Sequence, residues 1–430
     1  MAVSRRAVLA GLGGLATMSV VGCSNSGRSG GGSNSASKQL SVYYWGSDSR
    51  ATITNKVFDV FAKKYQGLSA KGQFLTFNNY FDKLATLAAS DSVPDIIQMN
   101  PGSLSQYSES GQLLDLSTLS LDLGDYQPSA LASGQIQGKQ FGLAFGYQYV
   151  TTFYNTEIVQ AAGIPVPTDL SSTWDDWVEY SLRLQAKLPS GIFAMTDGSS
   201  DSNAFESWIV GRGKSLFTED GKLGYDVSDA ADWFNFWTGL RAKGAIAPAA
   251  ETVTYIQSGT VTDSPFTKGK AALSLGINVG FQGYQQVNKA KLDVAACPAG
   301  PDRRCESNHF FGWSVSAKAK NTDAVKKFFE LWFTDPEVIK LLGTDRALPA
   351  SADQLAELKD NADPATKRLL DFSIEHPEIK PFNPPATPAA VGNEQSDSLQ
   401  RAAEAVLTGT SAPDAAAQQL VDDVTQALTS

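Results

Sequence analysis

An alternation of two sequence patterns between residues 40 and 99 most constrains how this chain can fold. Short β-prone runs occupy 40–45, 72–77 and 94–99, and apolar residues recur at helical spacing within 53–61 and 81–88. A β-α-β-α-β order predicts a parallel sheet covered by helices, because each helix carries the chain back so that the next strand runs in the same direction. The expected fold class is therefore α/β.

The loops that leave these strands are the first candidates for a binding site. In open α/β sheets, ligands bind in the crevice beyond the carboxyl ends of the strands, here after Trp45, Phe77 and Met99. Trp45 ends its strand, and Asp48 and Arg50 follow it in a polar turn. An aromatic face beside an acceptor and a planar donor suits a polar ligand. The alternatives are core packing of Trp45 and a surface ion pair between Asp48 and Arg50.

The rest of the chain continues the alternation of strands and helices. The glycine-interrupted run 141–154 is β-prone and suits a segment that crosses between two domains. Thr173 and Asp176 have the spacing of a capping box that opens a helix. Further strands are expected at 271–276, 292–296 and 310–316, and further helices at 325–332, 399–407 and 415–428. Tryptophans at helical spacing are expected to pack in a core, namely Trp174, Trp177, Trp233 and Trp237.

The amino-terminal segment resembles an export leader. Ser4-Arg5-Arg6 resembles a twin-arginine (Tat) signal, and Val20-Val21-Gly22-Cys23 resembles the lipobox of bacterial lipoproteins. These motifs predict that residues 1–22 are removed as a signal peptide, that Cys23 is acylated, and that 23–37 is a Ser/Gly-rich tether. A retained transmembrane helix is the alternative, but the apolar run is short and contains glycines, whereas about 20 apolar residues are needed to span a bilayer.

Charge argues against two classes of partner. The chain carries 35 Lys and Arg against 45 Asp and Glu, a formal net charge of −10. A net negative field repels nucleic acid and anionic lipid surfaces, so we expect no nucleic-acid partner and contact with the membrane through the lipid anchor only. At roughly 150 residues per domain, the length suits two or three domains.

Besides Cys23, the chain has two cysteines, Cys297 and Cys305. In an oxidising compartment, this pair predicts a disulfide in a surface loop. Zinc binding is the weaker alternative, because His309 and His376 are the two histidines of the sequence and no Cys-x-x-Cys spacing occurs. We expect no metal and no cofactor, and the sequence contains no nucleophile elbow or phosphate-binding loop.

Motifs spread along the chain together resemble the family 1 extracellular solute-binding proteins, the maltose-binding-like sugar receptors of ABC importers. No single motif is specific, but their order behind a lipobox carries the resemblance. The motifs are Trp45–Arg50, Pro94–Ile97, Phe153–Asn155, Thr173–Asp176, Gly269–Ala272, Pro298–Pro301, Phe311–Val315, Gly343–Arg346 and Leu407–Gly409.

The resemblance implies a two-lobed fold of the periplasmic-binding-protein type. Its α/β lobes would close on a ligand held in the cleft between them, in a Venus-flytrap motion. One lobe would comprise 38–145 with 313–376, and the other 146–311 with 381–430. A monomer is expected.

The same resemblance implies that the cleft holds an uncharged, hydroxyl-rich sugar. Aromatic faces cover the apolar side of a sugar ring, and polar side chains bind its hydroxyls. The residues Trp208, Asn278 and Phe281 lie near segments that border the cleft in the family, and core packing is the alternative for Trp208. The full set of candidate ligand-binding residues is Trp45, Asp48, Arg50, Asn78, Tyr80, Asn100, Tyr147, Trp208, Asn278, Phe281, Trp313 and Arg346.

The expected function is that of an extracytoplasmic binding protein, anchored by lipid to the outer face of the bacterial cell membrane. It would capture a mono- or oligosaccharide and deliver it to the transmembrane subunits of an ABC importer. It is not expected to be an enzyme. The alternatives are a secreted glycoside hydrolase, which needs only a suitably spaced pair of carboxylates, and an adhesion or signalling lipoprotein.

Overall fold

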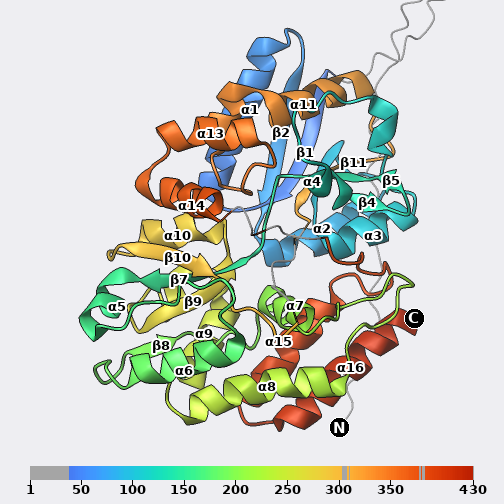
Figure 1. Ribbon diagram of the computed structural model, residues 1–430. Coiled ribbons are helices and arrows are strands. Elements are labelled where there is room, and N and C mark those ends of the chain that lie inside the picture. Colours follow the sequence, from blue (N-terminus) through green and yellow to red (C-terminus); the bar gives the residue numbers. More distant parts are fainter. Residues whose placement is uncertain (1–37, 303–307, 309, 377–378, 380–382, 430) are drawn as a thin grey trace, which may run out of the picture. The chain divides into compact units, whose positions relative to one another are not determined.

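A computed structural model shows a mixed α/β protein with two main sheets and helices around them (Figure 1). It describes residues 38–302, 308, 310–376, 379 and 383–429. The predicted leader, the predicted lipidation site Cys23 and the predicted tether lie outside these residues. So does Cys305, one half of the predicted disulfide. Its partner Cys297 is described and buried.

The first sheet has the strand order β2-β1-β3-β11-β6. Its strands are β1 (Gln39–Trp45), β2 (Ser69–Leu75), β3 (Ile96–Met99), β6 (Gly142–Ala144) and β11 (Gly312–Val315). The β1 strand pairs in parallel with β2 and β3, whereas β11 pairs antiparallel with β3 and β6. The crossover helices are α1 (Asp48–Lys64) and α2 (Phe77–Ala89), and α3 (Pro101–Glu109) follows β3. The predicted β-α-β-α-β order is confirmed.

The second sheet has the order β10-β7-β9-β8. Its strands are β7 (Val150–Asn155), β8 (Phe193–Met195), β9 (Ala271–Ile277) and β10 (Leu292–Ala296). The β7 strand pairs antiparallel with both β9 and β10, and β8 pairs in parallel with β9. The β-prone run 141–154 therefore supplies β6 to the first sheet and β7 to the second, so the chain crosses from one sheet to the other between Ala144 and Val150.

Helices make up most of the remaining chain. Those that follow β7 are α5 (Thr156–Ala162), α6 (Trp174–Gln185), α7 (Ser202–Gly211), α8 (Val227–Ala242), α9 (Ala249–Ser258) and α10 (Gly280–Val287). Those after β11 are α11 (Thr322–Thr334), α12 (Pro336–Leu342), α13 (Ala352–Asn361), α14 (Pro364–Glu375), α15 (Glu394–Leu407) and α16 (Pro413–Thr429). Short elements precede β6, namely η1 (Leu116–Leu119), α4 (Pro128–Ala132), β4 (Gln135–Ile136) and β5 (Lys139–Gln140), and η2 (Val261–Asp263) follows α9.

The tryptophan stripes predicted to be core are buried beside the second sheet. The capping box at Thr173 and Asp176 is confirmed, and it starts α6 so that two indoles face inward. Rings from α6, α7 and α8 meet edge to face at centroid distances of 5.4 to 5.9 Å. We call this the tryptophan cluster, and its members are Trp174, Trp208, Trp233, Phe236 and Trp237.

Two crossing segments between the sheets pair with each other. The backbone N–H of Tyr147 donates to the carbonyl of Leu348 at 2.8 Å, and the N–H of Leu348 donates back at 3.2 Å. Gly146 has φ +149°, and a Cβ there would lie 1.9 Å from the Leu348 carbonyl oxygen. Only glycine fits at this position, because a side chain would both strain the backbone and push the segments apart.

Helix α14 contacts α10 and β10 as well as α13. Leu369 and Leu370 of α14 share a buried cluster with Phe281 and Leu292 next to the second sheet. The predicted lobe division assigned 313–376 to the first lobe, and the packing of α14 favours moving this helix to the second. The division itself stays a prediction. In the described part of the chain, no helix combines the length and apolarity needed to cross a bilayer.

Candidate functional site

Aromatic rings gather at the carboxyl ends of β1 and β2, the edge at which α/β sheets commonly bind ligands. The Trp45 ring centroid lies 5.5 Å from that of Phe77, 5.1 Å from Tyr80, 5.6 Å from Phe81 and 6.0 Å from Phe311. Trp45 and Tyr80 are buried, whereas Phe77 is 47% exposed and Phe311 is half-buried. We call these five residues the edge cluster. In this cluster the exposed ring of Phe77 packs against the rings of Trp45 and Phe81.

Polar groups follow β1 directly. Ser47 caps α1 by accepting from the backbone N–H of Arg50 at 3.4 Å, and Asp48 is exposed in the first helical turn. Arg50 pairs with Asp345. Its Nε donates to Asp345 Oδ2 at 2.9 Å, and its terminal nitrogen donates to the Asp345 carbonyl at 2.7 Å. The expected alternative of an Asp48–Arg50 pair is therefore replaced by an ion pair with a residue 295 positions away.

Arg346 lies in the core of the first sheet. Its guanidinium donates to Gln98 Oε1 at 3.0 Å and to Thr54 Oγ1 at 2.8 Å. Burial and the nearby positive charge of Arg50 lower the pKa of Arg346 to about 9, which leaves it charged at neutral pH. Four aromatic rings surround the guanidinium carbon at 5.0 to 5.4 Å, those of Tyr44, Phe145, Trp313 and Trp332.

Asn100 begins α3 at the end of β3. Its Oδ1 accepts from the backbone N–H of Ser103 at 2.9 Å, and its Nδ2 donates to Asn393 Oδ1 at 2.8 Å. Next to it, a Cβ on Gly102 would lie 2.0 Å from the carbonyl oxygen of Gly392. The amino end of α3 thus touches the segment before α15 directly, and Asn100 holds that contact.

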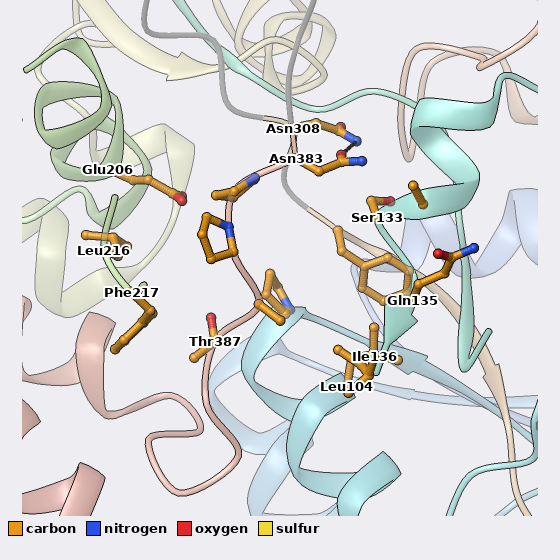
Figure 2. A pocket seen from close by; sticks show the side chains of 16 residues that line it. Leu104, Ser133, Gln135, Ile136, Glu206, Leu216, Phe217, Asn308, Asn383 and Thr387 are labelled. Atoms are coloured by element: carbon orange, nitrogen blue, oxygen red, sulfur yellow. Dashed lines mark hydrogen bonds between the residues drawn. The ribbon is translucent and has the colours of Figure 1, made fainter. Parts of the chain in front are cut away.

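A cavity of about 110 Å³ lies next to this contact (Figure 2). Its wall comes from α3, from the region of β4, from α7 and from the segment 383–387. The lining residues are Pro101, Leu104, Ala132, Ser133, Gln135, Ile136, Glu206, Leu216, Phe217, Asn308, Phe310, Asn383, Pro384, Pro385, Ala386 and Thr387. Among these described residues, Glu206 is the one with an ionisable side chain. The cavity therefore combines apolar surface with mostly neutral hydrogen-bonding groups.

Two amides at the cavity, Asn308 and Asn383, join four segments of the chain. Asn308 Nδ2 donates to Asn383 Oδ1 at 3.0 Å, as Figure 2 shows, and Asn308 Oδ1 accepts from the backbone N–H of Gln148 at 3.3 Å. Asn383 Nδ2 donates to the carbonyl of Ser129 at 2.6 Å. The two amides therefore link the crossing segment at Gln148 to the segment at Ser129, which precedes it, and to the segment at Asn383, which follows it.

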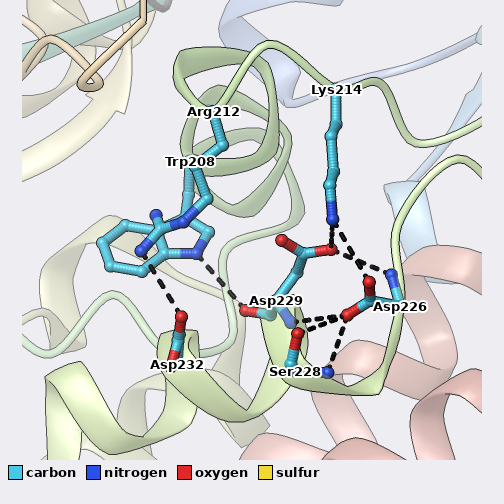
Figure 3. A network of polar contacts seen from close by, with 7 residues as sticks. All are labelled: Trp208, Arg212, Lys214, Asp226, Ser228, Asp229 and Asp232. Atoms are coloured by element: carbon cyan, nitrogen blue, oxygen red, sulfur yellow. Dashed lines mark hydrogen bonds and ion pairs between the residues drawn. The ribbon is translucent and has the colours of Figure 1, made fainter.

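Trp208 lies in the tryptophan cluster. Figure 3 shows its polar surroundings, which include Arg212 and Asp229. Its Nε1 donates to the carbonyl of Asp229 at 3.4 Å, and the guanidinium of Arg212 covers its ring at 3.5 Å from the centroid. Arg212 also pairs with Asp232 at 3.8 Å. The indole is 5% exposed. Both its ring face and its N–H are engaged, which favours the alternative of core packing.

The predicted site residues fall into three groups. Trp45 and Tyr80 meet in the edge cluster, and Asp48 follows Trp45 by three residues. Arg50, Trp313 and Arg346 belong to the first-sheet core and its rim. The others lie elsewhere. Asn278 is buried, and its Oδ1 accepts from the backbone N–H of Tyr149 at 3.4 Å. Phe281 is buried against Phe153, and the hydroxyl of Tyr147 binds that of Ser129. Asn78 lies in α2, and its side chain is outside the described part.

Several residues at the crevice and cavity were not predicted from the sequence. Phe77 and Phe311 carry the exposed side of the edge cluster, and Asn308, Asn383 and Glu206 line the cavity. Phe77 had one usable signal, because an aromatic residue directly after a strand of a parallel sheet faces the crevice. The amides had none, since their partners are 75 or more positions away.

This fold, with two α/β halves joined by paired crossing segments, defines a two-lobed binding protein of the periplasmic type. Structures of that type superimpose on most of the chain. The sequence matches the bacterial extracellular solute-binding protein family over residues 46–339, and the chain belongs to that family. The resemblance noted from the motifs is thereby confirmed. Family membership implies that the protein lies outside the cytoplasm and that it is a solute-binding component of an ABC transport system.

Three similar proteins illustrate the range of the family. The diacetylchitobiose binding protein DasA of Streptomyces coelicolor is 25% identical over 320 residues, which is 68% of each chain. The ABC substrate-binding protein Lmo0181 of Listeria monocytogenes, solved with cycloalternan, has a TM-score of 0.76 at 23% identity and covers 90% of this chain and 98% of its own. The GacH receptor of Streptomyces glaucescens, solved with acarbose, has a TM-score of 0.72 at 20% identity with the same coverage.

Proposed function

We propose that this protein captures an uncharged mono- or oligosaccharide and delivers it to the transmembrane subunits of an ABC importer. The observation that carries this proposal is the edge cluster, an exposed aromatic face at the carboxyl ends of parallel strands. Such a face covers the apolar side of a sugar ring, while neutral amides and hydroxyls bind its polar edge. The sugar ligands named for DasA, Lmo0181 and GacH support the same class of ligand.

We propose that Phe77, Phe311, Asp48 and Asn100 contact the sugar, with Trp45 holding Phe77 in place. The cavity of about 110 Å³ is small beside the roughly 300–1,000 Å³ of typical ligand pockets. Binding would therefore need the two halves to separate and close again around the ligand. The paired crossing segments at Tyr147 and Leu348 are where such a motion would bend.

A glycoside hydrolase is the competing function. Glycoside hydrolysis generally uses two carboxylates that flank the scissile bond, about 5 to 10 Å apart. The family match to solute-binding proteins favours binding over hydrolysis.

Attachment to the membrane would come from acylation of Cys23, which lies outside the described residues. The Val20-Val21-Gly22-Cys23 motif supports this. In the native host, Cys23→Ala should release the protein from membranes or stop its maturation. A processed Cys23→Ala protein that still fractionates with membranes would show that the anchor lies elsewhere.

The sugar is identified by thermal-shift screening of the mature chain against N,N′-diacetylchitobiose, maltotriose, cycloalternan and digalacturonic acid. A ligand at 100 times its Kd stabilises by about 2.7 kcal/mol, so a true ligand raises Tm clearly. We expect a neutral sugar to do so and the charged digalacturonic acid not to. Chromatography after prolonged incubation should recover the sugar uncut. Cleaved sugar would establish the hydrolase, and the absence of any shift across a wide neutral panel would contradict the proposal.

A further inference from the structure

A second, larger cavity lies on the paired crossing segments, and we call it the hinge pocket. Its volume is about 570 Å³, within the roughly 300–1,000 Å³ typical of small-molecule sites. It shares no lining residue with the cavity of Figure 2. Its lining residues are Gln127, Ser129, Tyr147, Tyr149, Leu348, Pro349, Ala350, Ser351, Ala352, Leu355, Ser373 and Ile379.

The walls of the hinge pocket come from elements on both sides of the crossing. Gln127, just before α4, is fixed to the crossing segment because its backbone N–H donates to the carbonyl of Ala350 at 2.8 Å. The opposite wall is α14, which packs on the second sheet and supplies Ser373. The floor is the Tyr147–Leu348 backbone pair. The pocket is therefore built on ordered backbone.

The chemistry of the lining selects the kind of ligand. No charged side chain is among the lining residues that the structure describes, so an ion would be desolvated without compensation. Tyr147 and Tyr149 supply ring surface, and Leu355 and Ile379 supply aliphatic surface. The hydroxyl of Tyr147 lies 2.5 Å from Ser129 Oγ, and that of Tyr149 lies 3.4 Å from Ser373 Oγ. Each pair of hydroxyls can exchange further hydrogen bonds with a ligand hydroxyl, because each oxygen both donates and accepts.

We propose that the hinge pocket binds an uncharged small molecule that has an apolar ring face and at least one hydroxyl. The site is distinct from the sugar crevice. In extended backbone, the side chains of Tyr147 and Tyr149 point to one side and that of Gln148 to the other. Gln148 Nε2 accordingly donates to the carbonyl of Arg346 at 2.5 Å, away from the pocket.

A chain of contacts runs from the hinge pocket to the cavity. Tyr147 binds the Ser129 hydroxyl, the Ser129 carbonyl accepts from Asn383, and Asn383 accepts from Asn308. Occupation of the hinge pocket would thus act on groups that line the cavity. This consequence rests on the proposed function, whereas the existence of the pocket site does not.

The proposal is tested with 2-naphthol as the probe, by titration calorimetry on the mature chain without any sugar. We expect saturable binding with one site. Ala352→Trp places an indole over the pocket from an exposed position at the start of α13, and it should weaken binding at least tenfold. Ala356→Trp is the matched control, on the same helix and exposed but outside the lining, and its binding should equal that of the parent.

Two further variants keep the outcome decisive. Ser373→Phe fills the pocket from α14 and serves if Ala352→Trp fails to fold, as judged by its melting curve. Tyr147→Phe keeps the ring but removes a hydroxyl, and should weaken binding about 3- to 10-fold. Absence of saturable binding at millimolar 2-naphthol, or equal binding by the parent and both blocked variants, would overturn the proposal. Because no sugar is present, this result is independent of whether the protein binds one.

Discussion

The edge cluster and the tryptophan cluster both consist of aromatic side chains, but they differ in how far their rings are exposed. In the edge cluster, the rings stand at the ends of strands, and Phe77 remains 47% exposed. In the tryptophan cluster, the rings come from helices that cover a sheet, and Trp208 and Trp233 donate their N–H groups to backbone carbonyls at 3.4 and 2.9 Å. Aromatic content alone therefore does not reveal a sugar site. A sugar site is indicated by the position of the ring at the end of a strand and by a ring face that no other group covers.

The largest effect should come from the centre of the tryptophan cluster. Trp233→Ala removes a fully buried indole that contacts Trp174, Phe205, Trp208 and Trp237. Its loss should lower the free energy of unfolding by about 3–5 kcal/mol, because the site cannot collapse around the missing ring. Urea denaturation measures this. A loss below about 1 kcal/mol would mean that the cluster is loosely packed and that the comparison fails.

The next effect concerns the buried guanidinium of the first sheet. Arg346→Lys keeps a positive charge but cannot bind Gln98 and Thr54 together. Losing a hydrogen bond to a buried charged group should destabilise by about 1.5–3 kcal/mol.

Arg50→Lys is the matched control for Arg346→Lys. The Arg50–Asp345 pair is partly exposed, so Arg50→Lys should lower the free energy of unfolding by only about 0–1 kcal/mol. Denaturation of both variants under one condition gives the comparison. Equal losses would show that the burial of Arg346 does not set its contribution.

A functional effect should separate the two clusters directly. Phe77→Ala should change the free energy of unfolding by less than about 1 kcal/mol, because the ring is half exposed, and weaken sugar binding by about 1–3 kcal/mol. Trp208→Ala should do the reverse, with a stability loss of about 3–5 kcal/mol. Calorimetric affinity for the identified sugar and a melting curve are needed for each. Unchanged affinity in Phe77→Ala would move the site away from the edge cluster.

The smallest effect is electrostatic and lies at the start of α8. The hydroxyl of Ser228, the backbone N–H of Asp229 and the ammonium of Lys214 lower the pKa of Asp226, as the contacts in Figure 3 show. A lowered pKa in the folded state stabilises the fold above the unfolded value of about 3.9, and this contribution is lost as the pH falls through the folded pKa.

Asp226→Asn keeps a capping oxygen and removes the charge, so it isolates this contribution. It should cost about 0.3–1 kcal/mol at pH 7, since the side chain is largely exposed and solvent screens it. The difference between parent and variant should shrink from pH 5 to pH 3. A difference that grows on acidification would contradict the assigned sign.

Local patterns predicted most of the fold. Alternation in β1 placed Val42 and Tyr44 on one face and Tyr43 and Trp45 on the other, and the structure confirms both faces. The β-prone run with internal glycines marked the crossing between sheets, and helical spacing marked the buried indoles. These features depend on neighbours within a few residues, which a single sequence contains.

The candidate site was less predictable because it depends on distant partners. Nothing near Arg50 in sequence shows that it binds Asp345. The sequence also does not show that the side chain of Arg346 packs among aromatic rings while that of its neighbour Asp345 lies at the rim of the core. The strand β2 ends at Leu75, two residues before the predicted end, and this places Phe77 on the first turn of α2. That shift gives Phe77 its exposure.

The uneven distribution of indoles has an optical consequence. Five of the eight tryptophans, Trp174, Trp177, Trp208, Trp233 and Trp237, belong to the core beside the second sheet. Intrinsic fluorescence followed during unfolding will therefore report mainly on that half of the molecule. Replacing Trp45 by phenylalanine would leave this signal nearly intact. A spectroscopic reporter of the crevice has to be introduced from outside.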